Sequence, residues 1–228
     1  MGQKVHPIAF RIGILKSWSS RWFARTHQGL LAEDVLLREW LRVRLRRSMV
    51  TAIDIERSSS IVKVIIATSR PGMLIGRGGA GIEELRRAII KKLSNIRGRV
   101  VNPSEIKVEV QEVRNPDGQA ALIGQSVAEQ LEKRLPFRRV LKRAVERAMG
   151  AGGGVQGAKI AIAGRLGGSE MSRREWLADG KIPLHTLRAD IDFAQETAYT
   201  TWGTIGVKVW LYKGEVFKEK QDLESNVR

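Results

Sequence analysis

Hydrophobic residues in the first half of the chain follow two periods, one typical of strands and one typical of helices. Alternating or β-branched apolar runs predict three strands, at residues 51–56, 61–66 and 106–111. Apolar residues three or four positions apart predict two helices. The acidic residues Glu33 and Asp34 are expected to open the first, and Gly98 closes the second. We expect a small two-layer α+β unit, with helices on one face of a three-stranded sheet.

The apolar pattern of the second half predicts another two-layer unit, which begins after the turn-forming string 115–118. We predict two amphipathic helices, to about Leu135 and over 136–149, a short helix from Ser172 to Leu177, and strands at 155–163, 187–197 and 205–212. The two domains are expected at 31–115 and 116–213, the second an α/β domain with a mainly antiparallel sheet. Residues 214–228 carry mixed charge and few apolar side chains, so we expect a disordered tail.

Residues 1–30 mix basic and aromatic side chains and are expected to form an N-terminal arm. Such an arm can stack on bases and neutralise phosphates. Its basic candidates for contacting RNA are Lys4, Arg11 and Arg21. For the aromatic residues Trp22 and Phe23 we favour a different role, in which they anchor the arm on the next domain.

The charge of the chain indicates a polyanionic partner. Its 228 residues include 40 Lys and Arg against 24 Asp and Glu, a formal net charge of +16. Nucleic acid is the first candidate for that partner and an anionic membrane surface the second. No apolar run approaches the roughly 20 residues of a membrane-spanning helix, and the N-terminus lacks a signal-peptide core. We therefore expect a cytosolic protein without a membrane partner.

Residue counts also restrict metal and redox chemistry. Cysteine is absent, which excludes disulfides and thiolate metal sites, and the three histidines are scattered. Asp190 and Asp192 fall on one side of a predicted strand and could form the carboxylate pair of a metal-dependent nuclease. Arg188 on the same side offers them a salt-bridge partner instead. We expect no metal site, no cofactor and no catalytic residue, and keep the metal-dependent nucleic-acid-processing enzyme as an alternative.

A glycine-rich string precedes the second helix of the first unit. Gly76, Arg77, Gly78 and Gly79 form a G-x-x-G between two helical segments, the device with which KH domains hold a nucleic-acid backbone. Glycines let phosphates approach the main chain, whose N–H groups point outward at a helix start, and Arg77 adds a cation. The order of elements over 31–115 is that of a type II KH domain, so we predict RNA binding at these four residues.

The same letters fit a second motif. Residues 76–81 satisfy G-x-G-x-x-G, the dinucleotide-binding fingerprint, which requires its first glycine directly after a strand. Here residues 69–75 intervene, and the pattern recurs at 152–157 between a predicted helix and a predicted strand, the reverse of the required order. No Walker-type G-x-x-x-x-G-K-[ST] string occurs in the sequence. We therefore predict no nucleotide cofactor and no ATP site.

The helix predicted at 136–149 has a one-sided charge. One of its sides is apolar, and the other holds a single acid, Glu146, among the bases Arg138, Arg139, Lys142, Arg143 and Arg147. Like charges on one face repel each other unless an anion lies on them, so this face predicts nucleic-acid binding. The sequence contains a second basic stripe, at Arg38, Arg42 and Arg46. This stripe fits a solvent-exposed face and a nucleic-acid-binding face equally well.

Several strings together resemble the bacterial S-three family of small-subunit ribosomal proteins. They are residues 1–7, 70–72, 76–79, 137–139, 164–168, 183–192 and 206–210. The likeness runs in order along nearly the whole chain, and the long string Pro183–Asp192 makes it specific. The long basic C-terminal extension of some family members is missing here.

The resemblance implies a structural protein of the small-subunit head that binds small-subunit rRNA beside neighbours of the S-ten and S-fourteen families. It also implies that the helix at 136–149 faces the channel through which mRNA enters, together with other entrance-channel proteins, and helps to open mRNA duplexes. The mRNA-contact candidates are Arg138, Arg139, Lys142 and Arg143. Further rRNA-contact candidates are Lys4, Arg11, Arg21, Arg165, Arg173 and Arg174.

A ribosomal role implies a location in the ribosome, in the cytoplasm or in a plastid or other organelle. The main alternative is a free-standing KH-type regulator or chaperone that binds single-stranded RNA off the ribosome. The letters of the motif do not distinguish a knuckle that grips single-stranded RNA from one that packs on folded rRNA.

Overall fold

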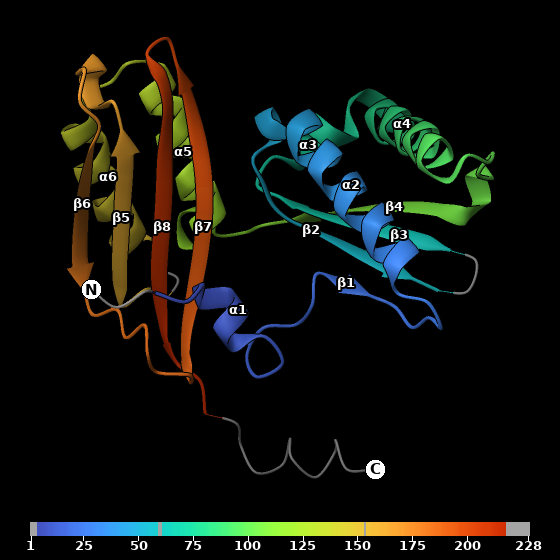
Figure 1. Ribbon diagram of the computed structural model, residues 1–228, viewed down its shortest axis with the longest axis horizontal. Helices are drawn as coiled ribbons and strands as arrows, with labels where there is room; N and C mark the ends of the chain where they lie inside the picture. Colours follow the sequence, from blue (N-terminus) through green and yellow to red (C-terminus); the bar gives the residue numbers. More distant parts are fainter. Residues whose placement is uncertain (1–3, 59–60, 153, 218–228) are drawn as a thin grey trace. The chain divides into compact units, whose positions relative to one another are not determined.

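The computed structural model describes residues 4–58, 61–152 and 154–217, and the chain folds into two compact units (Figure 1). The N-terminal unit is Trp18–Pro116, and the C-terminal unit joins Met1–Ser17 to Asp117–Arg228. The prediction of one arm over residues 1–30 is therefore wrong. Residues 4–17 pack with the C-terminal unit, whereas residues from Trp18 onward belong to the unit that follows them.

The N-terminal unit is a sheet of strand order β1-β2-β3-β4 packed against helices. Its longer elements are α2 (Gln28–Arg44), β2 (Val50–Arg57), β3 (Val62–Thr68), α4 (Ala80–Arg97) and β4 (Ile106–Glu112). Strands β2 and β3 are antiparallel, and β3 and β4 are parallel. Leucines of both helices pack on isoleucines and valines of the strands in one core. The predicted KH order of elements is confirmed.

Short elements complete this unit: α3 (Pro71–Ile75), β1 (Ser20–Arg21) and the 3₁₀ turns η1 (Arg46–Ser48), η2 (Arg77–Gly79) and η3 (Pro103–Glu105). Strand β1 adds a fourth strand to the predicted three, and it pairs in parallel with β2. Two residues are too few for a periodic signal, so the sequence pattern did not reveal it.

The acids Glu33 and Asp34 do not open helix α2, which begins five residues before Glu33. They lie inside the helix, where each forms an ion pair with one or two arginines whose side chains are almost fully buried. Arg57 Nη1 lies 2.8 Å from Glu33 Oε2, and Arg97 Nε lies 2.9 Å from Glu33 Oε1. Asp34, with an exposed fraction of 0%, accepts hydrogen bonds from Arg57 and from Trp22 Nε1. We call the four ionised side chains, Glu33, Asp34, Arg57 and Arg97, the buried charge cluster.

Trp22 thus anchors the segment before α2 to the N-terminal unit, as expected. Phe23 does not, because its side chain is 99% exposed. Arg38, from the stripe that sequence left open, donates to Ile53 O at 3.2 Å and to Ser20 Oγ at 2.7 Å. This arginine ties α2 to the sheet rather than pointing at a ligand.

The charge cluster gives the N-terminal unit a defined pH dependence. Burial by itself raises the pKa of Glu33, but hydrogen bonds from Arg97 and Arg57 outweigh it and hold that pKa below its usual value. A carboxylate with a lowered folded-state pKa contributes stability above its unfolded pKa of about 4.3, and this contribution is lost as the pH falls through the folded value. In urea titrations, the unit should lose stability below about pH 4.3, and Glu33→Gln should flatten this acid limb. An unchanged limb in the variant would contradict the assignment.

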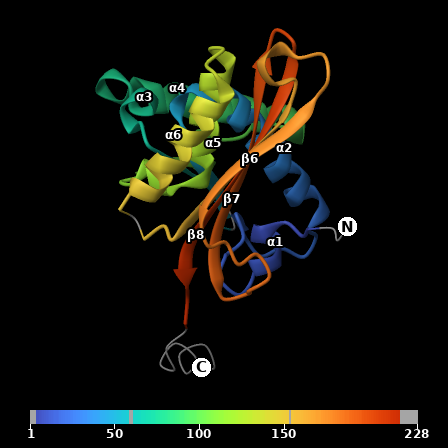
Figure 2. The same cartoon turned by 90° about the vertical axis from the view of Figure 1, so that its left-hand side faces the viewer.

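The C-terminal unit is an antiparallel sheet of order β6-β5-β8-β7. Its elements are α1 (Pro7–Arg11), η4 (Pro116–Gly118), α5 (Ala120–Glu132), α6 (Phe137–Gly150), β5 (Gly157–Gly164), η5 (Leu166–Gly168), β6 (Arg173–Gly180), β7 (Ala189–Thr200) and β8 (Gly203–Glu215). Figure 2 shows α5 and α6 on one side of the sheet and α1 on the other. The apolar stripes of α5 and α6 pack on the inward residues of the strands in one core. The predicted two-layer domain with an antiparallel sheet is confirmed.

Two predictions for this unit are wrong. The segment from Ser172 to Leu177 is not a short helix, because residues 173–180 pair along their whole length with β5 as strand β6. Hydrogen bonds to the preceding strand outweigh a weak local helix signal. The disordered tail was predicted to start at residue 214, and this start is wrong, since Gly214 and Glu215 complete β8. Residues 218–228 lie outside the described residues.

Arg11 is fully buried, with an exposed fraction of 0%, and holds α1 against the C-terminal unit. Its guanidinium donates to the carbonyl oxygens of Ala189 at 2.6 Å, Thr186 at 2.8 Å, Pro7 at 2.9 Å and Leu184 at 3.1 Å. Burial lowers its pKa, partly offset by the charge of Asp190. The prediction that Arg11 contacts RNA is therefore wrong: its donors are used inside the protein.

Candidate nucleic-acid interfaces

The glycine knuckle at residues 76–79 joins α3 to α4 through a backbone that only glycine adopts easily. Gly76, Gly78 and Gly79 have φ values of 68°, 61° and 82°. Gly81, in the first turn of α4, lies so close to α3 that an added Cβ would meet Leu74 O at 2.5 Å. The glycines of this motif therefore serve two purposes, a left-handed loop and the close approach of two helices.

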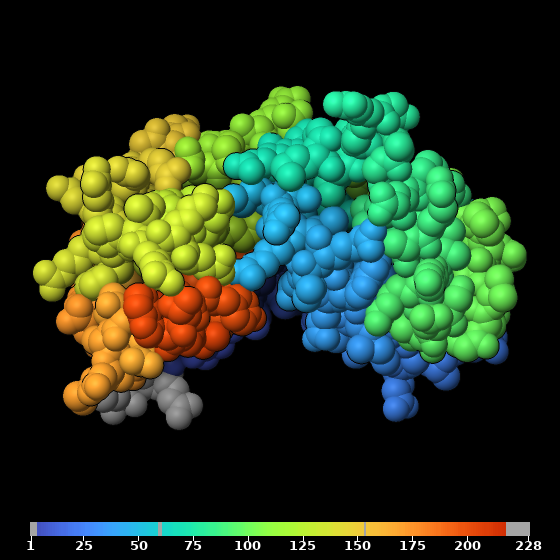
Figure 3. Space-filling model, turned by 90° about the horizontal axis from the view of Figure 1, so that it is seen from above, coloured from blue at the N-terminus to red at the C-terminus, as the bar shows by residue number. Residues whose placement is uncertain are grey.

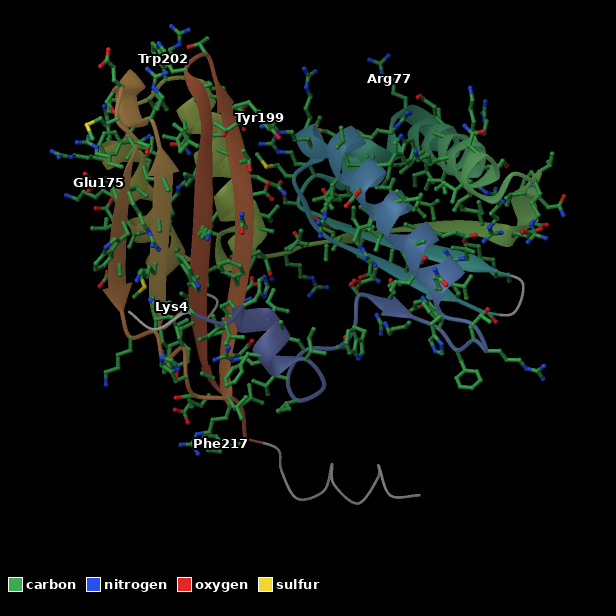
Figure 4. All side chains as sticks on the ribbon, viewed as in Figure 1. Lys4, Arg77, Glu175, Tyr199, Trp202 and Phe217 are labelled. Atoms are coloured by element: carbon green, nitrogen blue, oxygen red, sulfur yellow. The ribbon has the colours of Figure 1, made fainter. Side chains whose placement is uncertain are left out.

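The knuckle leaves groups available to an anion. The N-cap of α4 is Gly79, which has no side chain to cap the first amide groups of an 18-residue helix. Such a helix start carries partial positive charge. Arg77 is exposed and projects from the unit in Figure 4. On the adjacent α3, Met73 and Ile75 are exposed by 57% and 38% and offer apolar contact beside the loop. The sequence analysis did not single out these two residues.

Gly81→Ala should destabilise the N-terminal unit by about 1–3 kcal/mol, because the new methyl group overpacks the α3–α4 contact. Gly72→Ala is the matched control, since its added Cβ would meet nothing within 4 Å. Urea denaturation of both variants measures the difference. Equal stability of the two variants would show that the helices do not need this close approach.

Helix α6 forms the most one-sided cationic surface predicted from the sequence. Its apolar side is buried in the core of the C-terminal unit, whereas all five bases on the opposite side are exposed. The acid Glu146 is a poor neutraliser, since its Oε1 lies 3.9 Å from Lys142 Nζ and both side chains are mostly exposed. In Figure 3 this segment, coloured yellow-green to yellow, forms part of the visible surface. The geometry can hold a phosphate chain along the helix without reading its bases.

A pocket of about 170 Å³ opens at the start of α6. Phe137, Arg165 and Trp202 are among the residues that line it. The guanidinium carbon of Arg134 lies 5.1 Å from the ring centroid of Trp202. These residues come from the α5–α6 turn, the first turn of α6, the β5–β6 loop and the β7–β8 turn, which only the fold brings together.

Two predicted rRNA contacts gather near this pocket. Arg165 donates to Ser169 O at 2.9 Å and to Trp202 O at 3.3 Å, so part of its guanidinium holds the β5–β6 loop. Arg173 lies 5.2 Å from the ring centroid of Phe137. Their contact with rRNA stays a prediction.

The remaining candidates are dispersed. Arg21 lies 3.4 Å from Glu56 in the N-terminal unit. Lys4 and Arg174 are exposed on the C-terminal unit. Strand alternation turns Arg174 to the side of the sheet opposite that of Arg173.

The carboxylates proposed for a nuclease have separate partners. Asp190 Oδ1 lies 2.8 Å from Lys16 Nζ, whereas Asp192 Oδ2 accepts a hydrogen bond from Ala120 N at the start of α5. Within the described ranges, no group of three or more His, Cys, Asp or Glu side chains could hold a metal ion. In the same part of the chain, no helix is both long and apolar enough to cross a membrane.

Comparisons with known proteins agree with this architecture. Residues 36–118 match the family described as "KH domain", and residues 127–211 match "Ribosomal protein S3, C-terminal domain". The chain is 49% identical over 217 residues to "Small ribosomal subunit protein uS3" of Syntrophobacter fumaroxidans, covering 95% of this chain and 99% of that one. It is 47% identical to the protein of the same name from Magnetococcus marinus, covering 96% and 100%. It is 44% identical to "Small ribosomal subunit protein uS3c" of Pyropia yezoensis, covering 99% and 95%.

Proposed function

The chain belongs to the ribosomal protein S3 family, and from this membership we propose that helix α6 contacts mRNA as it enters the small ribosomal subunit. Family membership makes the chain a structural, RNA-binding component of the small ribosomal subunit and not an enzyme. Its place is the ribosome, in the cytoplasm or in an organelle. The proposal adds which surface meets which RNA.

The observation that carries the proposal is the charge of α6. Five exposed bases share one helix face with a single acid, on a helix held rigidly by its buried side. Arg138 and Lys142 lie one helical turn apart, about 6 Å, a spacing close to that of successive phosphates on one strand. Such an array attracts a single strand electrostatically, and each neutralised phosphate releases counterions.

The chain has no ATP-binding motif, so α6 contributes to unwinding only passively. By capturing strands that fray spontaneously, it biases a hairpin toward opening, while the energy for translocation comes from elsewhere. We further propose that the knuckle at residues 76–79 contacts small-subunit rRNA through Arg77 and the start of α4. Neighbours of the S-ten and S-fourteen families, implied by the resemblance, stay predictions.

Site-specific cross-linking tests the proposal. A photo-reactive amino acid at Lys142, in small subunits carrying a labelled mRNA, should cross-link to mRNA nucleotides downstream of the decoding site. The same group at Lys107 on β4 serves as the control and should not reach that mRNA segment. Cross-links from Lys142 to rRNA alone would contradict the mRNA contact.

Sedimentation tests the membership of the particle itself. In sucrose gradients at moderate salt, the chain should remain with small subunits. A free-standing RNA-binding regulator or chaperone would instead stay near the top of the gradient.

A further inference from the structure

The C-terminal sheet has a second face, which α5 and α6 do not cover. Strand alternation turns Ile160, Ile162, Val207 and Val209 toward the helices, where they are buried. The alternate residues turn the other way. Helix α1 lies on that side of the sheet but packs mainly with β7. A small apolar cluster that includes Ala161, Ile191 and Trp210 is also buried on this side, with Ile182 and Leu184 packed against it. The remaining residues we call the open sheet face, and it consists of Lys159, Ala163, Arg174, Trp176, Ala178, Gln195, Gly206 and Lys208.

The open sheet face is cationic and contains no acid. The strand registers place Trp176, Ala161, Lys208 and Gln195 in one row across the sheet. The neighbouring rows add Lys159 and Arg174. All the residues of this face are described by the structure, and among them there is no Asp or Glu. Three acids are adjacent in sequence to residues of this face, Glu175, Asp179 and Glu196, and alternation turns each of them to the other side. There Glu175 Oε1 lies 3.8 Å from Arg173 Nε.

A tryptophan stands within this cationic surface. Trp176 is 58% exposed although it lies within a strand. Lys159 Nζ lies 4.5 Å from its ring centroid and 5.8 Å from that of Trp210, so the lysine is held between two indoles. The residues beside Trp176 and Lys208 are small, chiefly Ala161, Ala163 and Gly206. Ala161 is itself buried, but Ala163 is exposed and Gly206 partly exposed, so a flat ligand has room beside the exposed indole on the side of Arg174.

The positive charges on this face are close enough to affect each other. Burial lowers the pKa of Lys159, and the neighbouring charges of Lys4 and Arg174 lower it further. Lys4, labelled in Figure 4, thus adds a fourth cation near the face. A bound anion would relieve this repulsion.

We propose that the open sheet face binds single-stranded RNA, with a base stacked on Trp176 and phosphates held by Lys208 and Arg174. Sheets that bind single-stranded RNA present aromatic side chains for stacking, and surrounding cations follow the backbone. A protein partner fits less well, because the buried centres of protein interfaces are depleted in lysine. The surface is distinct from α6, which lies on the other side of the sheet (Figure 2). The inference rests on the proposed function only in that the partner is RNA.

The test measures the affinity of the full-length chain for a fluorescent single-stranded RNA decamer by anisotropy at low salt. Trp176→Ala should weaken binding about 5- to 30-fold, the loss of one stacked base. Lys208→Ala should lower the slope of log affinity against log salt by about 0.7. Lys133→Ala, at an exposed lysine on the helix side of the same unit, is the matched control and should leave the affinity within about twofold.

Each outcome separates the open sheet face from α6. The same substitutions are repeated in a background in which Arg138, Arg139 and Lys142 are alanine. If Trp176→Ala and Lys208→Ala bind the decamer like their parents in both backgrounds, the proposal for the open sheet face is overturned. The proposal for α6 is then judged separately, by the affinity that the triple-alanine background loses. If only the sheet variants weaken binding, the proposal that α6 binds single-stranded RNA is overturned instead. If the wild-type chain does not bind the decamer, both proposals are overturned. Trp176→Phe, which keeps a stacking ring, should retain most of the affinity and excludes misfolding as the cause.

Discussion

Replacing Arg138, Arg139 and Lys142 together with alanine is expected to weaken the binding of single-stranded mRNA fragments about a hundredfold near 0.1 M salt. Each phosphate contact on a single strand contributes about 0.7 to the slope of log affinity against log salt, so three lost contacts remove about two decades relative to 1 M salt. The three side chains are exposed on a helix whose other side is buried, so the fold should not change. Salt titrations monitored by anisotropy measure both the affinity and the slope.

In ribosomes, the same triple variant should slow passage through mRNA hairpins while leaving unstructured messages nearly unaffected. A passive strand-capturing surface matters only where base pairs must fray ahead of decoding. Glu146→Gln is the matched control on the same face: it removes the single acid and should modestly strengthen binding. Equal slowing of the triple variant on both templates would contradict a role in unwinding.

Asp34→Ala is expected to destabilise the N-terminal unit by about 3–5 kcal/mol, because it leaves the Arg57 guanidinium buried without its closest partner. The carboxylate is fully buried and also accepts a hydrogen bond of 2.9 Å from Trp22 Nε1. Its loss therefore disturbs both α2 and the segment before it. Urea denaturation at pH 7 measures the change.

Asp54→Ala provides the comparison within the same unit. Asp54 lies 3.8 Å from Arg21, and both side chains are partly exposed, so its removal should cost less than about 1 kcal/mol. The double variant Asp34→Leu/Arg57→Met should recover much of the stability lost in Asp34→Ala, since an apolar pair carries no unpaired charge. Similar losses in Asp34→Ala and Asp54→Ala would show that the charge cluster does not hold the unit together.

Part of the candidate interface followed from sequence alone, because its signals are local. The apolar residues of α6 recur every three or four positions, and the glycines of the knuckle are close together in the sequence. Both signals are therefore visible within a short stretch of the chain. The face of bases on α6 is exposed, as its pattern predicted. The pocket beside Trp202 and the open sheet face escaped prediction, since each assembles residues from several strands and turns.

The sequence by itself determined the order of the longer elements of the N-terminal unit, its KH topology and the helix that presents Arg138 and Lys142, since apolar periodicity within a segment fixes which side is buried. Only the tertiary structure decided the roles of isolated charged residues and of segments whose sequence gives a weak secondary-structure signal. Arg11 donates to Ala189, 178 residues away, and the segment 173–180 becomes a strand because β5 supplies its hydrogen bonds. A buried polar group is stable only with its partner, and that partner is defined by contacts between distant segments that no local pattern records.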